Sequence, residues 1–404
     1  MSAFPRYWTA SAISALGSAV TAVALPVLVV QVLEASAFEV GLVNAAQFVP
    51  YAVLGLVAGV YVDRWRRRSV LVWASIGRAV CLGLIPLLWL AGALHLWVLI
   101  VLLLAFGAFA VFGFAATQSL LPQIVPRSRL LSPNARLDQA DATAQAAGPA
   151  IGGGLVALLG APLTIALDAV SYALDAVLIG GIRVDEERPR TRPRRRLHHE
   201  VREGLRWMYR HPRLRPLAVS THVWFVANGA ALTILAVFAL RTLDLSPAVY
   251  GVLFAVSGLA ALAGAGAAPA LGRRLGEGDA VLVARMLYPA AWILVLVAPD
   301  RGGVGAVVLL AAALALHGAA GGIENANELG YWQAVTPDRM LGRVNATRRA
   351  ANRTAGALGA VAGGAAVTLA GPRPALVAVV LVFAVAAVIG VASPLRGARG
   401  PAGD

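Results

Sequence analysis

The sequence predicts an all-α integral membrane protein whose twelve transmembrane helices form two parallel six-helix repeats. Of its 404 residues, 59% are hydrophobic and only 13% are charged. Soluble domains contain about 45–50% apolar and about 25% charged residues. A soluble globule of this composition would lack the polar residues needed to cover its surface. The apolar stretches, an internal repeat and the placement of the arginines all favour a membrane fold.

Twelve stretches are long and apolar enough to cross a bilayer, which takes about 20 residues. Proline and glycine inside several of them are compatible with membrane helices, because neighbouring helices can satisfy the freed backbone groups. The fifth and eleventh stretches begin with polar residues. The predicted spans lie at about 8–31, 40–62, 69–91, 96–119, 138–160, 162–182, 215–239, 248–271, 279–298, 303–325, 344–369 and 374–394.

An internal repeat relates the two halves of the chain. Residues 134–153 align with residues 345–364 at a constant offset of 211, without a gap. The same offset superposes the Val-Leu-Val segments at 70–72 and 281–283. Two copies of one structural unit are therefore expected. The glycines at 148, 152 and 153 fall on Gly359, Gly363 and Gly364.

The arginines predict the orientation of the spans. All but a few of the 34 basic residues lie on the side of the termini when spans alternate from a cytoplasmic N-terminus. Positive residues favour the cytoplasmic side, so both termini are expected there. The predicted domains are an N-terminal six-helix bundle (1–182), a cytoplasmic basic linker (183–214), a C-terminal bundle (215–396) and a short cytoplasmic tail (397–404).

The linker between the halves permits two interpretations. Its first part, 185–196, is charged and rich in proline, which is typical of a flexible linker. Its second part carries Val201, Leu205 and Met208 at helical spacing. This pattern predicts an amphipathic helix on the inner membrane surface. The alternative is a solvated basic linker that obeys the same charge rule.

The loop between the second and third spans carries a charged motif. It reads Gly59-Val-Tyr-Val-Asp63-Arg64-Trp-Arg-Arg67-Arg68. The glycine permits close helix packing, and the carboxylate can hold a neighbouring helix end or an arginine. The alternative is that these arginines only mark topology, as arginines after a membrane helix often do. The functional interpretation therefore rests on the spacing of the glycine and the Asp-Arg pair.

A second motif lies in the fifth span, where Gly148-Pro149 is followed by Gly152-Gly153. Proline removes a backbone hydrogen bond and kinks a helix, and glycine lets a neighbouring helix approach closely. These residues predict a bent, tightly packed hinge. The second repeat has Ala360 in place of the proline. Generic small-residue packing is the alternative.

The two motifs, on this twelve-span plan, resemble signatures of the major facilitator superfamily. The loop is similar to the G-x-L-x-D-R-x-G-R-[RK] signature, from which Tyr61 and Arg66 depart. The span-five motif is similar to the G-P-x-x-G-G core associated with exporters. Leu121-Pro122 with Val125-Pro126, and the Gly342-Arg343-Val344 triplet, resemble the branch that contains enterobactin exporters and macrolide efflux proteins.

The resemblance implies a secondary exporter in a bacterial inner membrane. Drug-like molecules, siderophores or secreted metabolites are the implied substrates, with proton antiport and alternating access. In the family, the aspartate at position 63 locks the inner gate against the start of span eleven, which here carries Arg343, Arg348 and Arg349. The intramembrane arginine in span four of many drug–proton antiporters is absent, which places their coupling scheme in doubt. An uptake transporter and a non-transporting sensor or scaffold remain alternatives.

Ionisable residues within or beside the spans are candidates for a coupling network, because charges in a membrane are costly and often functional. Arg78 lies deep in span three and needs a partner. At the offset of 211 its counterpart is Pro289, so buried charge is expected chiefly in the first half. We expect it to pair with a carboxylate, and one carboxylate to exchange a proton. A static ion pair is the alternative. The candidate network comprises Arg78, Asp138, Asp141, Asp168, Asp175, Glu324 and Arg343, with Glu324 facing Arg343 across a loop.

Amide and aromatic residues within the spans predict a substrate cavity between the halves, since such linings suit bulky amphipathic ligands. Each of them alone is more often a helix–helix contact. The candidates are Asn44, Gln47, Tyr51, Gln118, Gln145, Trp224 and Asn228, with Thr117 and His222 beside them.

Other functional classes are disfavoured by the same sequence. No Gly-rich phosphate loop is present, so an enzyme or an ATP-driven pump is not expected. The single cysteine, Cys81, excludes a cysteine-based metal site. The charged residues cluster in short runs between the apolar stretches, which argues against a nucleic-acid partner. The expected partners are a small-molecule substrate and the lipid bilayer. We expect no cofactor or metal, with the proton gradient as the driving force. A functional monomer is expected, because one chain supplies both halves.

Overall fold

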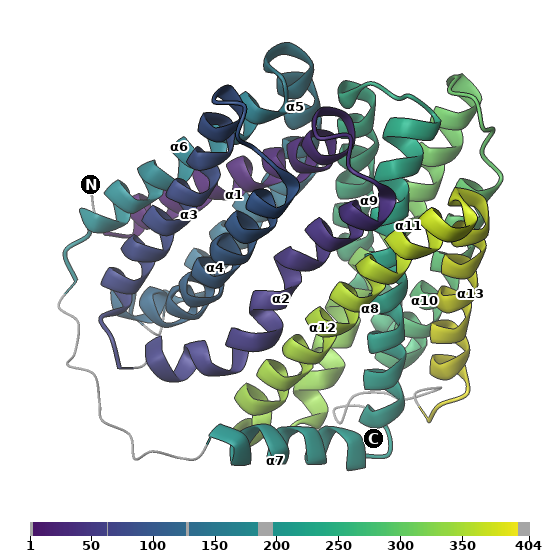
Figure 1. Ribbon diagram of the computed structural model, residues 1–404. Coiled ribbons are helices and arrows are strands. Elements are labelled where there is room, and N and C mark those ends of the chain that lie inside the picture. Colours follow the sequence, from purple (N-terminus) through teal and green to yellow (C-terminus); the bar gives the residue numbers. More distant parts are fainter. Residues whose placement is uncertain (1–2, 63, 127–128, 185–196, 395–404) are drawn as a thin grey trace. The chain divides into compact units, whose positions relative to one another are not determined.

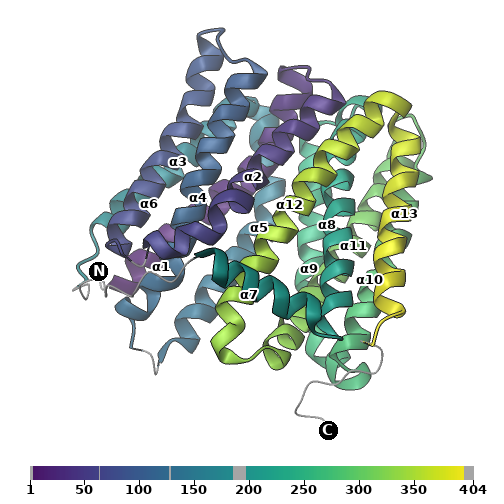
Figure 2. The same ribbon diagram turned by 60° about the horizontal axis from the view of Figure 1, so that its bottom comes forward.

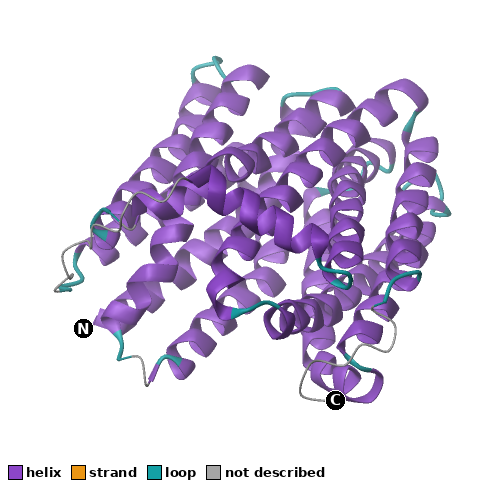
Figure 3. Ribbon diagram, turned by 90° about the horizontal axis from the view of Figure 1, so that it is seen from below, coloured by secondary structure: helices purple, strands orange, loops and turns teal. Residues whose placement is uncertain are grey.

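The computed structural model describes residues 3–62, 64–126, 129–184 and 197–394. Within these ranges all regular structure is helical, and the helices are joined by loops (Figure 3). The all-α prediction is confirmed. The helices are α1 (Ala3–Val27), α2 (Ala37–Val62), α3 (Arg67–Leu90), α4 (Leu96–Ile124), α5 (Leu131–Leu159), α6 (Ala161–Gly180), α7 (Leu197–Arg210), α8 (Leu214–Val237), α9 (Pro247–Leu275), α10 (Glu277–Leu296), α11 (Val304–Val335), α12 (Asp338–Ala370) and α13 (Pro372–Val391).

Eleven helices among the described residues are long and apolar enough to cross a membrane. The remaining predicted span, 344–369, is the eleventh in order and lies within α12, whose first half is rich in arginine. With 33 residues, α12 is about 50 Å long at the α-helical rise. A hydrocarbon core is about 30 Å thick, so the apolar second half of α12 can cross it while the charged first half lies outside. The cytoplasmic placement of the termini stays a prediction.

The chain forms two compact units. Unit 1 comprises residues 1–35, 46–194 and 246–252, and unit 2 comprises 36–45, 195–245 and 253–404. These units follow the predicted halves except that the first turns of α2 belong to unit 2 and those of α9 belong to unit 1. The exchange is symmetric in the repeat, because α2 and α9 are the second helix of their respective halves.

The same packing pattern occurs in both units, as a repeat requires. In unit 1, α1 packs on α5 and α6, and α3 packs on α4 and α6 (Figure 1). In unit 2, α8 packs on α12 and α13, and α10 packs on α11 and α13 (Figure 2). Each helix of the first half therefore has a counterpart seven places later in the order, since α7 stands between the halves.

The first helix of each unit ends in the same irregular way. A π-helical turn, Leu28–Val32, follows α1, and a second one, Phe238–Thr242, follows α8. Each is followed by an acidic residue with positive φ, Glu34 at 49° and Asp244 at 50°. A serine lies two residues further on in both cases, and its hydroxyl caps the following helix by accepting a backbone N–H. These positions are related by 210 residues, so the repeat carries a one-residue shift relative to the offset of 211.

Helix α7 is an integral part of unit 2. Met208 is fully buried in a cluster with Leu217 and Val281, and the Tyr209 hydroxyl hydrogen-bonds His222 of α8 at 2.8 Å. The Glu203 carboxylate forms an ion pair with Arg343 of α12 at 2.6 Å. The interpretation of this segment as a solvated linker is therefore wrong for residues 197–210. The predicted helix is present, and protein rather than the membrane surface covers its apolar face. Residues 185–196 lie outside the described residues.

Candidate functional site

The Gly-Pro segment of α5 is a close crossing within unit 1. A Cβ atom added to Gly152 would lie 2.8 Å from the Val20 carbonyl oxygen of α1. One added to Gly153 would lie 2.5 Å from the Pro247 carbonyl oxygen, at the start of α9. Real Cβ atoms essentially never lie closer than 3.0 Å to another heavy atom. The backbones thus approach as closely as glycine allows, and Pro149 leaves one helical carbonyl without its usual donor.

The corresponding glycines of α12 make the equivalent contacts within unit 2. A Cβ atom on Gly363 would lie 2.6 Å from the Ala230 Cα atom of α8. One on Gly364 would lie 3.0 Å from the Phe38 Cα atom, at the start of α2. The glycine part of the motif is therefore a property of both repeats. Only the proline, replaced by alanine in α12, is specific to the first half.

Arg78 and Asp175 meet through a serine inside unit 1. The Arg78 guanidinium donates to the Ser75 hydroxyl at 3.1 Å, and this hydroxyl donates to the buried Asp175 carboxylate. The guanidinium also lies 4.2 Å from the ring centroid of Tyr172, a favourable cation–π distance. Ser75 thus lies between Arg78 and Asp175, and the predicted pairing of Arg78 with a carboxylate stays a prediction.

Asp168 is buried about two helical turns from Asp175 in α6, and its carboxylate has hydroxyl partners. Its side chain is only 1% exposed. The Thr21 hydroxyl donates to one carboxylate oxygen at 2.7 Å, and the Ser171 hydroxyl donates to the other at 2.8 Å. A Cβ atom on Gly17 of α1 would overlap this carboxylate. Gly17 therefore makes the room that Asp168 occupies, which the sequence did not indicate.

A cavity of about 360 Å³ opens onto this cluster in unit 1. Arg78 and Asp168 line it together with Gln47 and Tyr51, two of the predicted cavity residues. Aromatic rings cover much of the remaining wall. They belong to Phe106, Phe114 and Tyr172, with Thr117 beside them.

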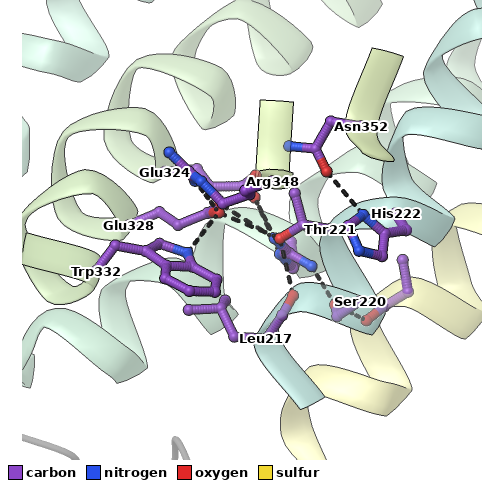
Figure 4. A network of polar contacts seen from close by, with 11 residues as sticks. Leu217, Ser220, Thr221, His222, Glu324, Glu328, Trp332, Arg348 and Asn352 are labelled. Atoms are coloured by element: carbon purple, nitrogen blue, oxygen red, sulfur yellow. Dashed lines mark hydrogen bonds and ion pairs between the residues drawn. The ribbon is translucent and has the colours of Figure 1, made fainter. Parts of the chain in front are cut away.

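A second buried charge network lies in unit 2 (Figure 4). Arg285 of α10 is 1% exposed and forms ion pairs with Glu324 at 2.8 Å and Glu328 at 3.2 Å. It also donates to the hydroxyls of Ser220 and Thr221 in α8. Buried charges in proteins are normally paired and hydrogen-bonded in this manner. The network joins α8, α10 and α11.

Sequence analysis missed Arg285 because it was counted with the topology-marking arginines at a span start. The constant offset of 211 also placed Pro289 opposite Arg78, which assigned the buried charge mainly to the first half. That assignment is wrong. An arginine between Ala284 and Met286 within an apolar stretch was the available signal.

Glu328 extends the network to α12. Its carboxylate forms an ion pair with Arg348 at 2.9 Å and accepts a hydrogen bond from the Trp332 indole nitrogen at 3.2 Å. Glu324 does not face Arg343 as predicted, because Arg285 binds Glu324 and Glu203 binds Arg343. Figure 4 shows Glu328 between Trp332 and Arg348.

A cavity of about 310 Å³ lies over the unit 2 network. Thr221, Glu324, Glu328 and Arg348 line its polar part. Trp224, a predicted cavity residue, lines it and stacks on the His317 ring at 6.3 Å between centroids. The nearby His222 contacts the Asn352 side-chain oxygen at 2.7 Å. The prediction of one cavity shared by the two halves stays a prediction.

Other predicted site residues lie outside these two cavities. Asp138 and Asp141 are exposed on α5, and Asp141 accepts a hydrogen bond from Gln145 at 3.1 Å. The Asn44 amide donates to Thr233 at 3.0 Å within unit 2. Gln118 is exposed on α4, and Asn228 is half-buried on α8.

The charged loop motif is described only in part. Asp63 lies outside the described residues, so its gating role stays a prediction. Gly59 is in α2 and Arg64 is exposed in the following turn. Arg67 begins α3, and Arg68 donates to the Gly180 carbonyl oxygen at the end of α6.

Comparison with known proteins identifies the family. The family described as transmembrane secretion effector, within the major facilitator superfamily, matches residues 1–400. The chain belongs to this family. It is a membrane transporter of the major facilitator type and not an enzyme.

Two relatives illustrate the range of the family. The chain is 31% identical over 218 residues to the multidrug efflux pump Tap of Mycobacterium tuberculosis, covering 52% of each chain. It thus spans about half the length of these first curated relatives. It is 26% identical over 366 residues to the MFS-type transporter YfiS of Bacillus subtilis, covering 87% of this chain and 84% of YfiS.

Solved structures agree on the fold. The nucleoside transporter NupG superposes with a TM-score of 0.77 and 11% identity, covering 97% of this chain and 99% of that one. A bacterial homologue of the iron transporter ferroportin, in an inward-facing state, has a TM-score of 0.74 and 16% identity, covering 98% of both chains. At these identities the likeness concerns the fold alone.

Proposed function

We propose that this major facilitator transporter is a proton-coupled exporter of amphipathic small molecules. The observation that carries the proposal is a buried carboxylate, Asp168, that lines a cavity together with aromatic rings and the half-buried Arg78. A transporter driven by protons needs an ionisable group within its spans that can bind and release one. Intramembrane carboxylates commonly serve such proton relays.

Asp168 is suited to proton exchange by the chemistry of its partners. Hydroxyl groups both donate and accept hydrogen bonds. Thr21 and Ser171 can therefore donate to the carboxylate when it is ionised and one can accept from its O–H when it is protonated. Glu324 and Glu328 differ, because Arg285 donates to both and cannot accept. We assign Asp168 to proton exchange and the unit 2 carboxylates to holding helices together.

The cavity favours ligands with apolar rings and few polar groups. Its wall combines Phe106, Phe114 and Tyr172 with the amide of Gln47 and the hydroxyl of Tyr51. Cavities that bind small molecules are mostly apolar with a few orienting polar groups. Arg78 and Asp168 would orient a ligand, and Asp168 would bind either the ligand or the proton.

Export is favoured over uptake by two observations. The relatives named multidrug efflux pump Tap share 31% identity with this chain. The α5 segment retains the Gly148-Pro149-x-x-Gly152-Gly153 motif, and its glycines lie where neighbouring helix backbones approach α5 closely. Such crossings rearrange between discrete packings when access alternates. We place the transporter in a bacterial inner membrane, where a proton gradient is available, and expect a single chain to suffice.

Everted membrane vesicles test the proposal. Energised vesicles carrying the chain are mixed with a macrolide, a lipophilic cation or a catechol siderophore, and accumulated compound is measured with and without a protonophore. Accumulation of at least one compound that the protonophore abolishes is expected, and Asp168→Asn vesicles are expected to lack it. Asp141→Asn is the matched control, because Asp141 is exposed and its carboxylate accepts a hydrogen bond from Gln145 on the same helix.

Two other results would overturn the proposal. Gradient-dependent accumulation in right-side-out vesicles, and not in everted ones, would establish uptake. Equal accumulation in vesicles with and without the chain, for every compound of the three classes, would favour a sensor or scaffold.

A further inference from the structure

A groove of about 480 Å³ lies between α7 and the turn that joins α11 to α12. Trp207 of α7, Pro337 of the turn and Met340 in the first turn of α12 form its apolar wall. The groove lies where spans end, since α11 ends at Val335 and α8 begins at Leu214. Headgroups occupy this level of a bilayer, and tryptophan is enriched there.

Two arginines give the groove a positive charge. Arg206 and Arg210 line it, are exposed, and stand one helical turn apart on the same face of α7. Like charges at this spacing repel each other. Neither arginine has an ion pair with a carboxylate in the part of the chain that the structure describes.

The acidic residue in the groove does not cancel this charge. Glu203 lines the groove, but its carboxylate is bound by Arg343 at 2.6 Å. Burial, helped by the nearby charge of Arg213, lowers the pKa of His211, another lining residue. At neutral pH His211 is uncharged, so the arginines determine the sign of the groove.

The groove is held in shape by the packing of α7. Met208 is buried on the opposite face of the helix, and Tyr209 hydrogen-bonds His222. A Cβ atom on Gly204 would lie 2.9 Å from the Thr347 hydroxyl oxygen, so α7 lies directly against α12. A ligand of the groove would therefore bind a preformed surface.

We propose that this groove binds the headgroup of an anionic phospholipid. The phosphate would lie between Arg206 and Arg210, whose planar guanidinium groups suit phosphate oxygens. The apolar wall formed by Trp207 and Met340 would contact the glycerol and upper acyl chain. Basic pockets at the ends of membrane helices bind anionic headgroups by this chemistry. The proposal concerns the bilayer as a partner and does not depend on the transported substrate.

The test measures lipid binding to the purified full-length chain. Phosphatidylglycerol and phosphatidylcholine with identical acyl chains are titrated in detergent, and bound lipid is counted by native mass spectrometry. The test variant is Arg206→Gln/Arg210→Gln. The matched control, Arg183→Gln/Arg202→Gln, removes the same charge from exposed positions that do not line the groove. A third variant, Arg206→Lys/Arg210→Lys, keeps the charge and removes the planar fork.

One phosphatidylglycerol molecule is expected to bind the wild type and the matched control equally. Each arginine near a headgroup contributes about fivefold in affinity, so the test variant is expected to bind about thirtyfold more weakly. The lysine variant is expected to fall between them. Phosphatidylcholine is expected to show no variant-dependent binding.

Two outcomes would overturn the proposal. Equal phosphatidylglycerol binding by the test variant and the control would exclude the groove. Displacement of the bound lipid by inorganic phosphate at equal concentration would identify a phosphate site instead of a lipid site. Unchanged thermal unfolding of the test variant in detergent without lipid is the check that it folds.

Discussion

Replacing Gly153 with alanine tests the close crossing of α5 most simply. The new Cβ atom would lie 2.5 Å from the Pro247 carbonyl oxygen and 3.0 Å from the Gly251 Cα atom. Ordinary contact begins at 3.4 Å, so the two backbones would have to separate by about 1 Å. Overpacking of this kind costs about 1–3 kcal/mol.

Gly154→Ala supplies the matched control for this perturbation. Nothing lies within 4 Å of a Cβ atom at Gly154. Alanine gains about 1 kcal/mol over glycine in a helix interior, and this gain is common to both variants. The difference between the variants therefore isolates the cost of the contact, and thermal unfolding of both purified proteins measures it.

Transport gives a second measurement on the same pair. A cost of 1–3 kcal/mol placed on one conformation lowers its population by about fivefold to more than a hundredfold. We expect Gly153→Ala to lower the initial rate of transport in proportion, while Gly154→Ala retains the wild-type rate. Indistinguishable stability and transport of the two variants would refute the reasoning from the crossing.

Three further substitutions test the side-chain networks. Arg285→Ala would remove the Arg285 guanidinium from two buried carboxylates, and a loss of about 3–5 kcal/mol in unfolding free energy is expected. The exposed control Arg274→Ala should show no loss. Equal melting temperatures of the two variants would contradict the network. Glu203→Gln removes a partly exposed ion pair, so calorimetry should detect at most about 1 kcal/mol, and a loss like that of Arg285→Ala would be inconsistent with the described geometry. Gly17→Ala places a methyl group against the Asp168 carboxylate. Gradient-driven transport by this variant should fall several-fold while its expression in the membrane persists. Transport by the variant at the wild-type rate would show that this contact is not needed.

The apolar stretches and the repeat were enough to predict the fold. Hydrocarbon thickness sets the length of a span, and this rule does not depend on which helices touch. The span at 344–369 shows the limit of this rule, because the arginines in the first half of α12 make the helix less apolar than the eleven helices that are long and apolar enough to cross a membrane.

The repeat predicted less about individual side chains. A one-residue shift separates the offset of 210 at Ser36 and Ser246 from the offset of 211 at Gly148 and Gly359. A helix turns by about 100° per residue, so one residue decides which neighbour a side chain faces. Arg285 lies 207 residues after Arg78, about one helical turn before position 289, so neither offset places the two arginines opposite each other.

Partners contributed by other helices were also beyond the sequence. Asp168 is held by Thr21 of α1, and no spacing along the chain brings these residues together. The apolar face of α7 was predicted correctly, but an amphipathic pattern does not specify whether lipid or protein covers that face. Met208 packs on protein, which only the tertiary structure decides.

The most direct test of proton coupling compares two modes of transport in proteoliposomes that contain the purified chain. One experiment imposes a pH gradient and measures uphill accumulation of a substrate found in the vesicle assay. The other measures exchange of labelled for unlabelled substrate without a gradient. If Asp168 carries the proton, Asp168→Asn abolishes accumulation and retains exchange, whereas the wild type and Asp141→Asn perform both. Gradient-driven accumulation at the wild-type rate in Asp168→Asn would contradict the account.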